Sequence, residues 1–478
     1  MNKKIICIVL PIIMLLLLGS AVTVCVINFG TKTVKVSFVT QGGRLLSEQK
    51  LDAKMLENVK YSHLCPMGYK IVETESKGNK IIAKVDFLAY KMPIINIETE
   101  NNAPIVDKEN YVSSTVSVTN CDAEYQKTEV LAGVRYRGNS TMQANKKAYR
   151  IKFDKREGML GLNNGAECKS WVLLAETYDP SMQRNFAMFS FAKNLNIYSS
   201  DCTYVEMFLN GEYMGVYLLA EHMQIDKYRI NIEEYDPETS DPVNTGYLIE
   251  NEDYTYQSDE CYFQCGPGGV GFEYSYWVMK SDTTTQDQID YIFDYMVQVY
   301  DAIYGANEAK IRELIDVDSA VERIIIELFL NDTDANASYK VWKDKDGKLT
   351  FGAPWDADLA MGNIASMQGT AVYLNHLTEQ LMMSNQWFYD ILKERWLALY
   401  NQGKFTEWYQ LIEATADKYV SEFARNDARW KVFGEKAVQQ AVFLKTAWPN
   451  YTCQKEASED LLDWLEYRIE TLKSIHFR

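Results

Sequence analysis

The chain has 478 residues and carries 66 acidic against 49 basic side chains, which gives a formal charge of −17 at pH 7. This balance excludes a general nucleic-acid-binding protein, because contact with phosphate backbones needs clustered lysine and arginine. It is compatible with divalent cations, or with a protein substrate that is basic or rich in serine. Only four histidines occur and the cysteines show no zinc-like spacing, so a zinc site is not expected.

Residues 1–30 predict a signal anchor. Lys3 and Lys4 precede a mostly apolar run from Ile5 to about Phe29, which as a helix would be long enough to cross a membrane. The run exceeds the apolar part of a typical signal peptide, and the lysines favour an N-terminus inside the cell. We therefore expect a membrane-anchored protein with its catalytic part outside the cytoplasm. Secretion after signal cleavage is the alternative.

The rest of the chain predicts an α+β architecture. Residues 31–88 have the strand patterns of a small β-rich module, and a longer domain follows at 89–478. Its first part, 89–282, is strand-rich, with one helix expected near 180–195. From 283 to 478 the pattern is helical, with segments at 377–400, 405–424, 434–447 and 455–475. A strand-rich part followed by a helical part predicts a cleft between the two.

The most informative segment is Gly352–Asp358, together with the loop Asn331–Asn336. Between them, Ser338–Lys343 and Lys348–Phe351 flank a Lys345-Asp346-Gly347 turn, which predicts a hairpin. A hairpin would bring the two acidic segments to the same end. Asp356 and Asp358 are two residues apart, so an extended backbone points both to one face. Such oxygen ligands suit magnesium, although two solvated acidic loops would have the same composition.

Three further segments could carry chemistry. Arg135–Ser140 predicts a strand and a glycine turn, and Lys146–Phe153 predicts the next strand, so the turn could cover phosphates that a lysine neutralises. Arg184-Asn185 falls in the expected helix near 180–195. Glu221 ends a predicted strand and could pair with a phosphate-contacting lysine. The signatures of P-loop proteins and ordinary protein kinases are absent.

Taken in order, these segments resemble the CotH kinase family, which is named for a spore-coat protein. The resemblance covers roughly residues 92–365 and rests on five segments. These are Met92–Ile97, Arg137–Ser140 with Lys146–Phe153, Trp171–Ala175 with Asp179 and Arg184-Asn185, Val205–Glu221, and Pro354–Asp358. Ala357 departs from the pattern, because the family usually has a larger residue there.

The resemblance implies a divergent protein-kinase-like fold and transfer of phosphate from ATP to serine or threonine of surface or spore-coat-like proteins. It implies Mg²⁺ at Asp356 and Asp358, with Asn336 as a further ligand. Asp334 or Asp332 would accept the hydroxyl proton, and Lys147 would contact phosphate. The expected nucleotide-binding residues are Arg137, Asn139, Lys147, Arg184 and Glu221. Phosphoryl transfer needs positioning and charge neutralisation above all, which such residues could supply.

Two other functions remain open, because a domain outside the cell meets little ATP. One is a cell-surface binding or scaffold protein that keeps the fold without turnover. The other is a metal-dependent hydrolase that uses the same carboxylates to activate water and needs no nucleotide.

Overall fold

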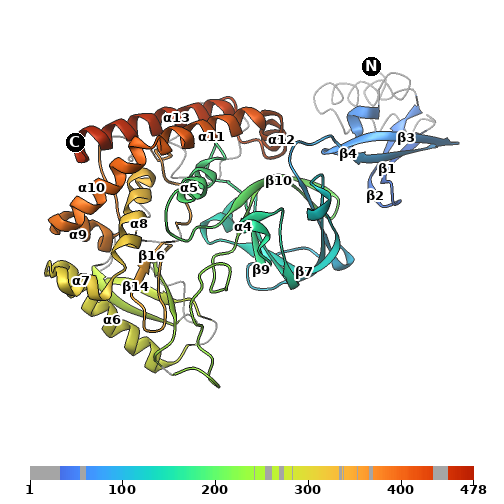
Figure 1. Cartoon of the computed structure of the whole chain (residues 1–478). Helices are drawn as coiled ribbons and strands as arrows, with labels where there is room; N and C mark the ends of the chain where they lie inside the picture. Colours follow the sequence, from blue (N-terminus) through green and yellow to red (C-terminus); the bar gives the residue numbers. More distant parts are fainter. Residues whose placement is uncertain are drawn as a thin grey trace, which may run out of the picture. The chain divides into compact units, whose positions relative to one another are not determined.

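The computed structural model describes residues 33–53, 61–241, 243–252, 261–267, 274–281, 284–332, 336, 338–352, 354–364, 370–433 and 451–478. The chain divides into two compact units (Figure 1). The first runs to Lys91 and includes Phe208–Tyr213, and the second comprises Met92–Met207 and Met214–Arg478.

The first unit is built on a four-stranded sheet with the order β2-β1-β4-β3. The central strands β1 and β4 are parallel and the outer pairs are antiparallel. Side chains alternate along each strand, so Val36 and Phe38 on β1 and Ala83 and Val85 on β4 are buried. The strands are β1 (Thr33–Thr40), β2 (Leu45–Asp52), β3 (Tyr69–Lys77) and β4 (Lys80–Phe87), and the short helix η1 spans Tyr61–Leu64.

The second unit begins with a closed barrel of strand order β10-β11-β9-β8-β7-β6-β5. It closes where the N–H of Glu206 on β10 donates to the carbonyl of Pro93 before β5, at 2.9 Å. On β8, the large apolar side chains Tyr149, Ile151 and Phe153 are buried, and the residues between them are polar. The strands are β5 (Ile94–Thr99), β6 (Val112–Thr119), β7 (Lys127–Arg137), β8 (Ala148–Glu157), β9 (Cys168–Leu174), β10 (Cys202–Leu209) and β11 (Glu212–Glu221).

A helical layer packs around α5 (Arg184–Ala192), which is buried along almost its whole length. The ring of Phe191 packs edge-on against Phe329 of α8 and at a tilt against Trp408 of α11. Trp408 donates its indole N–H to the carbonyl of Ala187 at 2.8 Å. The other helices of this layer are α8 (Val317–Leu330), α9 (His376–Ser384), α10 (Gln386–Asn401), α11 (Lys404–Lys418), α12 (Val420–Trp430) and α13 (Gln454–Thr471).

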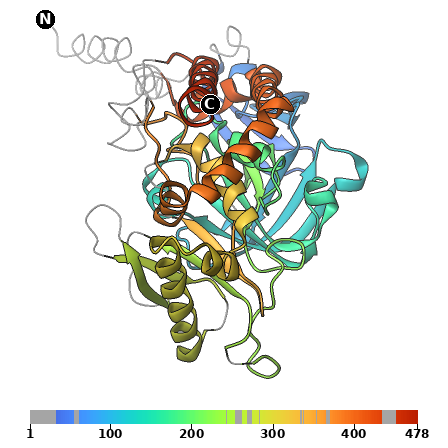
Figure 2. The same ribbon diagram turned by 60° about the vertical axis from the view of Figure 1, so that its left-hand side comes forward.

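A second sheet has five strands in the order β13-β14-β12-β15-β16. Figures 1 and 2 show α6 (Gln286–Tyr304) lying against this sheet, and α6 begins at a capping box formed by Thr285 and Gln288. The strands are β12 (Tyr247–Glu252), β13 (Tyr262–Pro267), β14 (Tyr274–Met279), β15 (Tyr339–Lys343) and β16 (Leu349–Phe351), with α7 (Glu308–Leu314) between α6 and α8. The predicted hairpin is confirmed as β15 and β16, which pair antiparallel.

The predicted fold class is wrong in its membrane anchor, and the boundary that we expected at residue 282 runs through one sheet. We expected a strand-rich part to 282 and a helical part from 283 on. Instead, β12 and β14 from the first part pair with each other, and β12 pairs with β15 from the second part to make one sheet. The strands before them close into a barrel rather than joining that sheet. Local sequence patterns show strands but not their partners, which is why the division was misplaced.

The predicted membrane anchor and membrane-anchored localisation are also corrected. In the part of the chain that the structure describes, no helix is both long and apolar enough to cross a membrane. The longest, α6, carries Asp287, Asp290, Asp294 and Asp301 along its length. The segment 1–30, on which the prediction fell, lies outside the described residues, as does the helix predicted at 434–447.

Candidate functional site

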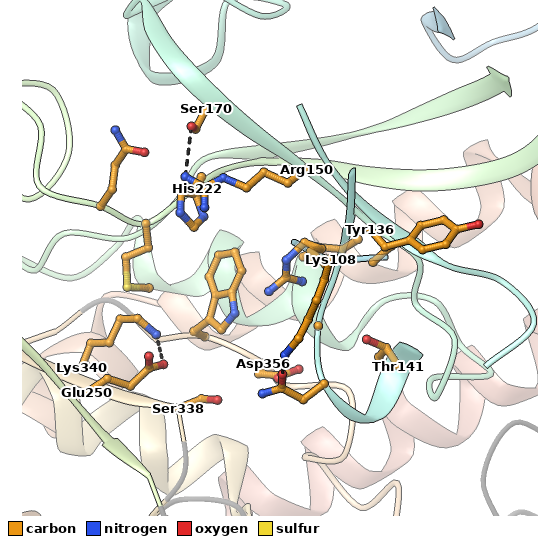
Figure 3. Close-up of a pocket in the computed structure, with 18 of the residues that line it drawn as sticks. Lys108, Tyr136, Thr141, Arg150, Ser170, His222, Glu250, Ser338, Lys340 and Asp356 are labelled. Carbon is orange, nitrogen blue, oxygen red and sulfur yellow. Dashed lines mark hydrogen bonds and ion pairs between the residues drawn. The ribbon is translucent and has the colours of Figure 1, made fainter. Parts of the chain in front are cut away.

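The second unit contains a cavity of about 710 Å³. Its lining comes from strands β7–β9 of the barrel with the turn after β7, from β12 and β15 of the second sheet, and from the segment 355–358 after β16. Figure 3 shows Glu250 and Lys340 on one side of the cavity and Arg150, Ser170 and His222 on another. The lining residues are far apart in the sequence, so only the folded chain assembles the site.

Asp356 and Asp358 both line this cavity, with Ala357 buried between them. Asp356 has a φ of 65°, in the left-handed region that aspartate enters more readily than most side chains. The N–H of Ala357 donates to Oδ1 of Asn185 on α5 at 2.9 Å. The small residue at 357 therefore packs into the interior while its neighbours reach the cavity.

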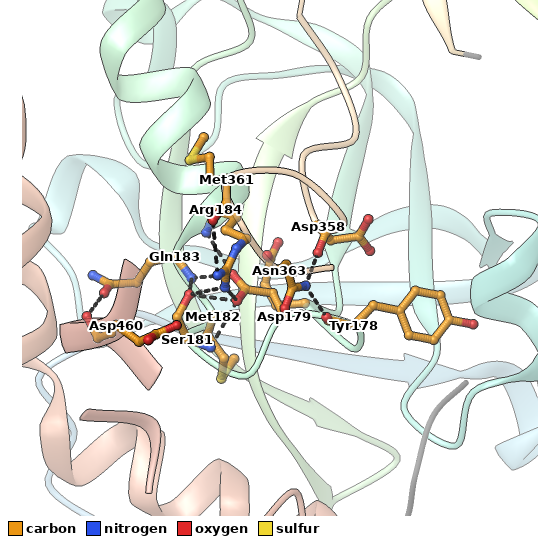
Figure 4. Close-up of polar contacts among 12 residues, drawn as sticks. Tyr178, Asp179, Ser181, Met182, Gln183, Arg184, Asp358, Met361, Asn363 and Asp460 are labelled. Carbon is orange, nitrogen blue, oxygen red and sulfur yellow. Dashed lines mark hydrogen bonds and ion pairs between the residues drawn. The ribbon is translucent and has the colours of Figure 1, made fainter. Parts of the chain in front are cut away.

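Arg184, the first residue of α5, binds the backbone just after Asp358. Its Nε donates to the carbonyl of Ala360 at 3.0 Å and its Nη2 to that of Met361 at 3.3 Å. Its Nη1 pairs with Asp179, whose carboxylate also accepts the backbone N–H of Gln183 and Arg184 at 2.8 and 2.7 Å. Figure 4 shows this network, in which a buried aspartate stabilises the N-terminus of α5 and the arginine fixes the acidic segment.

The carboxylates in the cavity repel one another. Burial, followed by the neighbouring Asp356 and Glu176, raises the pKa of Asp358 well above its usual value. Burial and the nearby Asp179 raise the pKa of Glu176 to about 8, against the effect of the hydrogen bond that it accepts from Asn185. A divalent cation at this position would remove the repulsion.

Asp356 and Asp358 are a suitable pair of ligands for Mg²⁺, because this ion commonly takes only one or two protein carboxylates. Among the described residues, no three His, Cys, Asp or Glu side chains are arranged to hold a metal ion by themselves. Mg²⁺ keeps several waters and is commonly bound by one or two carboxylates together with substrate phosphates. Asp356 and Asp358 can supply that number of ligands, so the donor set matches magnesium better than a metal that needs a full protein cage.

Cations face the acidic segment from the barrel. Arg137, at the end of β7, has its guanidinium over the Trp355 ring at 5.2 Å from the centroid. Burial lowers its pKa, and the attraction of Asp356 and Asp358 opposes that effect. Asn139, in the turn that follows, accepts a hydrogen bond from Nζ of Lys108 at 2.8 Å, and both line the cavity.

On the second sheet, Lys340 of β15 and Glu250 of β12 lie opposite each other in register and form a buried ion pair. Lys280 also approaches Glu250, at 3.0 Å. Burial favours the neutral acid, but the attraction of Lys340 and Lys280 outweighs it and lowers the pKa of Glu250 to about 2. The pair therefore stays charged and fixes a lysine at the cavity wall.

The structure brings Arg137, Asn139, Asp356 and Asp358 together at the cavity, but not Lys147, Arg184 or Glu221. Lys147 does not line the cavity, and its Nζ donates to the carbonyl of Met142. Arg184 is not part of the lining either, and it binds the carbonyls of Ala360 and Met361, just after Asp358. Glu221 is buried away from the cavity, where it accepts hydrogen bonds from Asn163 at 3.0 Å and from the N–H of Asp201 at 2.9 Å.

The loop before the hairpin is only partly described. Asp334 lies outside the described residues. Asp332 is buried and is not part of the cavity lining. Asn336 accepts the N–H of His376 at 3.0 Å and is not part of the lining either.

The polar residues of the lining that sequence reasoning did not assign to the site include Arg150, Glu176, Glu250 and Lys340. One signal could have found Arg150. Tyr149, Ile151 and Phe153 are the apolar positions of β8, so the alternation puts Arg150 and Lys152 on the opposite face. No comparable local signal marks Glu250 and Lys340, because their pairing joins distant strands.

Comparison with known proteins adds one finding. The family model described as CotH kinase protein matches residues 134–472, which is most of the chain. No curated protein matches the chain.

Proposed function

We propose, from the premise that the chain belongs to the CotH kinase protein family, that it is a magnesium-dependent phosphotransferase. It would move the terminal phosphate of ATP to a serine or threonine hydroxyl of a spore-coat-like protein. The observation that carries the proposal is the cavity, where Asp356 and Asp358 lie beside Arg137 and face the Lys340–Glu250 pair. Carboxylates for a metal and cations for phosphates in one cavity are what this chemistry requires.

Asp356 and Asp358 would hold Mg²⁺, which when bound supplies charge neutralisation at the phosphate oxygens. The raised pKa of Asp358 supports this assignment, because it comes first from burial and then from the neighbouring Asp356 and Glu176, and a bound cation would offset both effects. Arg137 and Lys340 would contact the phosphates in place of Lys147. Arginine suits this role because its fork of N–H donors matches phosphate oxygens.

The transfer itself needs a proton acceptor. As the new bond forms between the hydroxyl oxygen and the terminal phosphorus, the bond from that phosphorus to the leaving ADP oxygen breaks. The hydroxyl proton goes to a carboxylate, for which we propose Asp332 or Asp334. The variants Asp332→Asn and Asp334→Asn distinguish them, because only the acceptor's loss should reduce the transfer rate by a factor of about 10² or more.

Calorimetric titration of the protein with ATP, with and without magnesium, tests the proposal. We expect binding that requires magnesium and is lost in Asp356→Asn. The matched control is Asp154→Asn, an exposed carboxylate on β8 outside the cavity lining, which should bind like the parent. Magnesium-dependent binding that survives in Asp356→Asn would contradict the assigned site. A folded protein that binds no ATP would contradict the kinase function.

A further inference from the structure

The turn between β7 and β8 is fixed by two consecutive residues that follow β9. Residues 138–141 of this turn line the cavity. The hydroxyl of Tyr178 donates to the carbonyl of Ser140 at 2.7 Å. The hydroxyl of the neighbouring Thr177 donates to the carbonyl of Lys146 at 2.8 Å. The segment after β9 therefore binds the turn near both of its ends.

Tyr178 is also joined to the acidic segment, through the side chain of Asn363. Nδ2 of Asn363 donates to the carbonyl of Tyr178 at 2.7 Å and to the carbonyl of Asp358. Figure 4 shows Asn363 between these two residues. Tyr178 and Asn363 are both buried, where polar groups need partners within the protein. Tyr178 thus contacts the turn through its hydroxyl and is linked to Asp358 through its carbonyl group.

The ring of Tyr178 packs against side chains from the same two segments. It forms a small buried cluster with Ala144 of the turn, and Leu359 and Ile364 pack against this cluster. Leu359 and Ile364 both follow Asp358 in the chain. Because closely packed interiors transmit displacements from one side chain to the next, a shift of either segment is felt by the other.

The charge of the acidic segment extends to the Tyr178 hydroxyl. Burial raises the pKa of this group, the hydrogen bond with Ser140 lowers it, and the carboxylates of Asp358 and Asp356 raise it further. The net effect is a raised pKa, so the hydroxyl keeps its proton at neutral pH. It can therefore donate to the turn whether or not the carboxylates hold a metal.

We propose that Tyr178 is a positioning residue, which couples the turn to the acidic segment so that both contact one Mg²⁺–ATP in register. This inference rests on the proposed kinase function. A triphosphate whose metal is held at Asp356 and Asp358 would also meet the turn, and such a site needs both parts held to within about 0.5 Å. Tyr178 is not part of the cavity lining, so it acts through the residues that it binds.

Hydrogen–deuterium exchange of the full chain without any ligand tests the connection itself. The N–H groups of Met142 and Ala144 donate to carbonyls within the turn, at 3.1 and 3.2 Å. In Tyr178→Phe, which removes only the hydroxyl, these amides should exchange at least about threefold faster, because the turn opens more easily. Asn363→Leu cuts the connection at its other end and should also speed their exchange.

Calorimetric titration with ATP in the presence of magnesium tests the positioning role. Tyr178→Phe should weaken ATP binding about fivefold or more, which corresponds to the loss of one hydrogen bond. The matched control is Tyr295→Phe on α6, where the lost hydroxyl donates to the carbonyl of Leu314, also at 2.7 Å, and lies outside the cavity lining. The control should bind ATP like the parent, although both variants should show similar shifts in melting temperature.

The double variant Tyr178→Phe with Asn363→Leu distinguishes one connection from two independent effects. Two changes on the same connection should not multiply, so the double variant should bind Mg²⁺–ATP within about twofold of the weaker single variant. A full product of the two single effects would overturn the inference.

Three other results would also overturn it. They are parent-like ATP affinity in Tyr178→Phe, equal losses of affinity in Tyr178→Phe and Tyr295→Phe, and unchanged exchange of the turn in Tyr178→Phe or Asn363→Leu. Failure of the kinase function is distinguishable, because the parent itself would then bind no ATP. Faster exchange of the turn in both variants would still establish the connection through Tyr178.

Discussion

The adjacent residues Lys146 and Lys147 differ in how deeply they are buried. Lys146 is buried, donates from Nζ to the carbonyl of Val216, and lies 4.4 Å from the centroid of the Tyr217 ring. Lys147 is half-buried and bonds the carbonyl of Met142. Burial lowers the pKa of Lys146 to about 7, although Glu176 and Glu206 attract its charge.

This difference predicts a pH dependence of stability. Between about pH 7 and pH 10.5 the unfolded chain keeps a proton on Lys146 that the folded protein has released. The free energy of unfolding contributed by this group therefore rises with pH through that window. Relative to Lys146→Met, which cannot titrate, the parent should gain stability from pH 7 to pH 10. Thermal unfolding across this range measures the change, with Lys147→Met as the control. A pH-independent difference for Lys146→Met would contradict the prediction.

The ionised carboxylate of Asp358 should lower the stability of the folded protein, although it would serve to bind the metal. Burial, followed by the neighbouring Asp356 and Glu176, raises the pKa of its carboxyl well above the usual value. A raised acid pKa means that the folded state loses stability as pH rises above the unfolded value. In a chelator at pH 8, Asp358→Asn should therefore raise the melting temperature by roughly 2–4 °C, and less at pH 5. Asp154→Asn should not. A lower melting temperature for Asp358→Asn would show that its carboxylate is already compensated.

At the scale of elements, the first turn of α5 determines where the acidic segment lies. Arg184 joins Asp179 to the carbonyls of Ala360 and Met361. Both members of the Arg184–Asp179 pair are buried, so removing one leaves an uncompensated charge. We therefore propose that Arg184 positions Asp358 and does not contact the nucleotide.

Arg184→Met should lower the free energy of unfolding by about 3 kcal/mol and abolish magnesium-dependent ATP binding. The control is Lys193→Met at the end of the same helix, where the ion pair with Asp201 is half-exposed and its loss costs under about 1 kcal/mol. Denaturant unfolding and calorimetry measure the two effects. A stable Arg184→Met protein with normal ATP affinity would contradict the positioning role.

At the scale of the molecule, the strand-rich and helical parts are interdependent. β12 lies between β14 and β15, so it needs a strand from beyond residue 330 to complete its hydrogen bonds. Phe191 on α5 is likewise covered by Phe329 and Trp408. The boundary at 282 therefore crosses one cooperative structure.

A fragment of residues 92–282 should consequently fail to fold on its own. It would leave β12 without β15 and expose the apolar face of α5. We expect no cooperative thermal transition by circular dichroism, in contrast to the full chain. A sharp transition for the fragment would show that the barrel is independently stable and that the second sheet only docks on it.

The sequence by itself determined the local elements and the family. Alternation of apolar residues specifies β8, and an Asp-Gly turn specifies the hairpin β15–β16, because both depend on neighbours a few residues apart. It also identified Asp356, Asp358 and Arg137 as cavity residues. Tertiary structure alone decided that the barrel closes, that β12 pairs with β15, and that Lys340 and Glu250 meet at the cavity. These are contacts between distant segments, whose partners are chosen by the packing of the whole chain and leave no mark in local sequence.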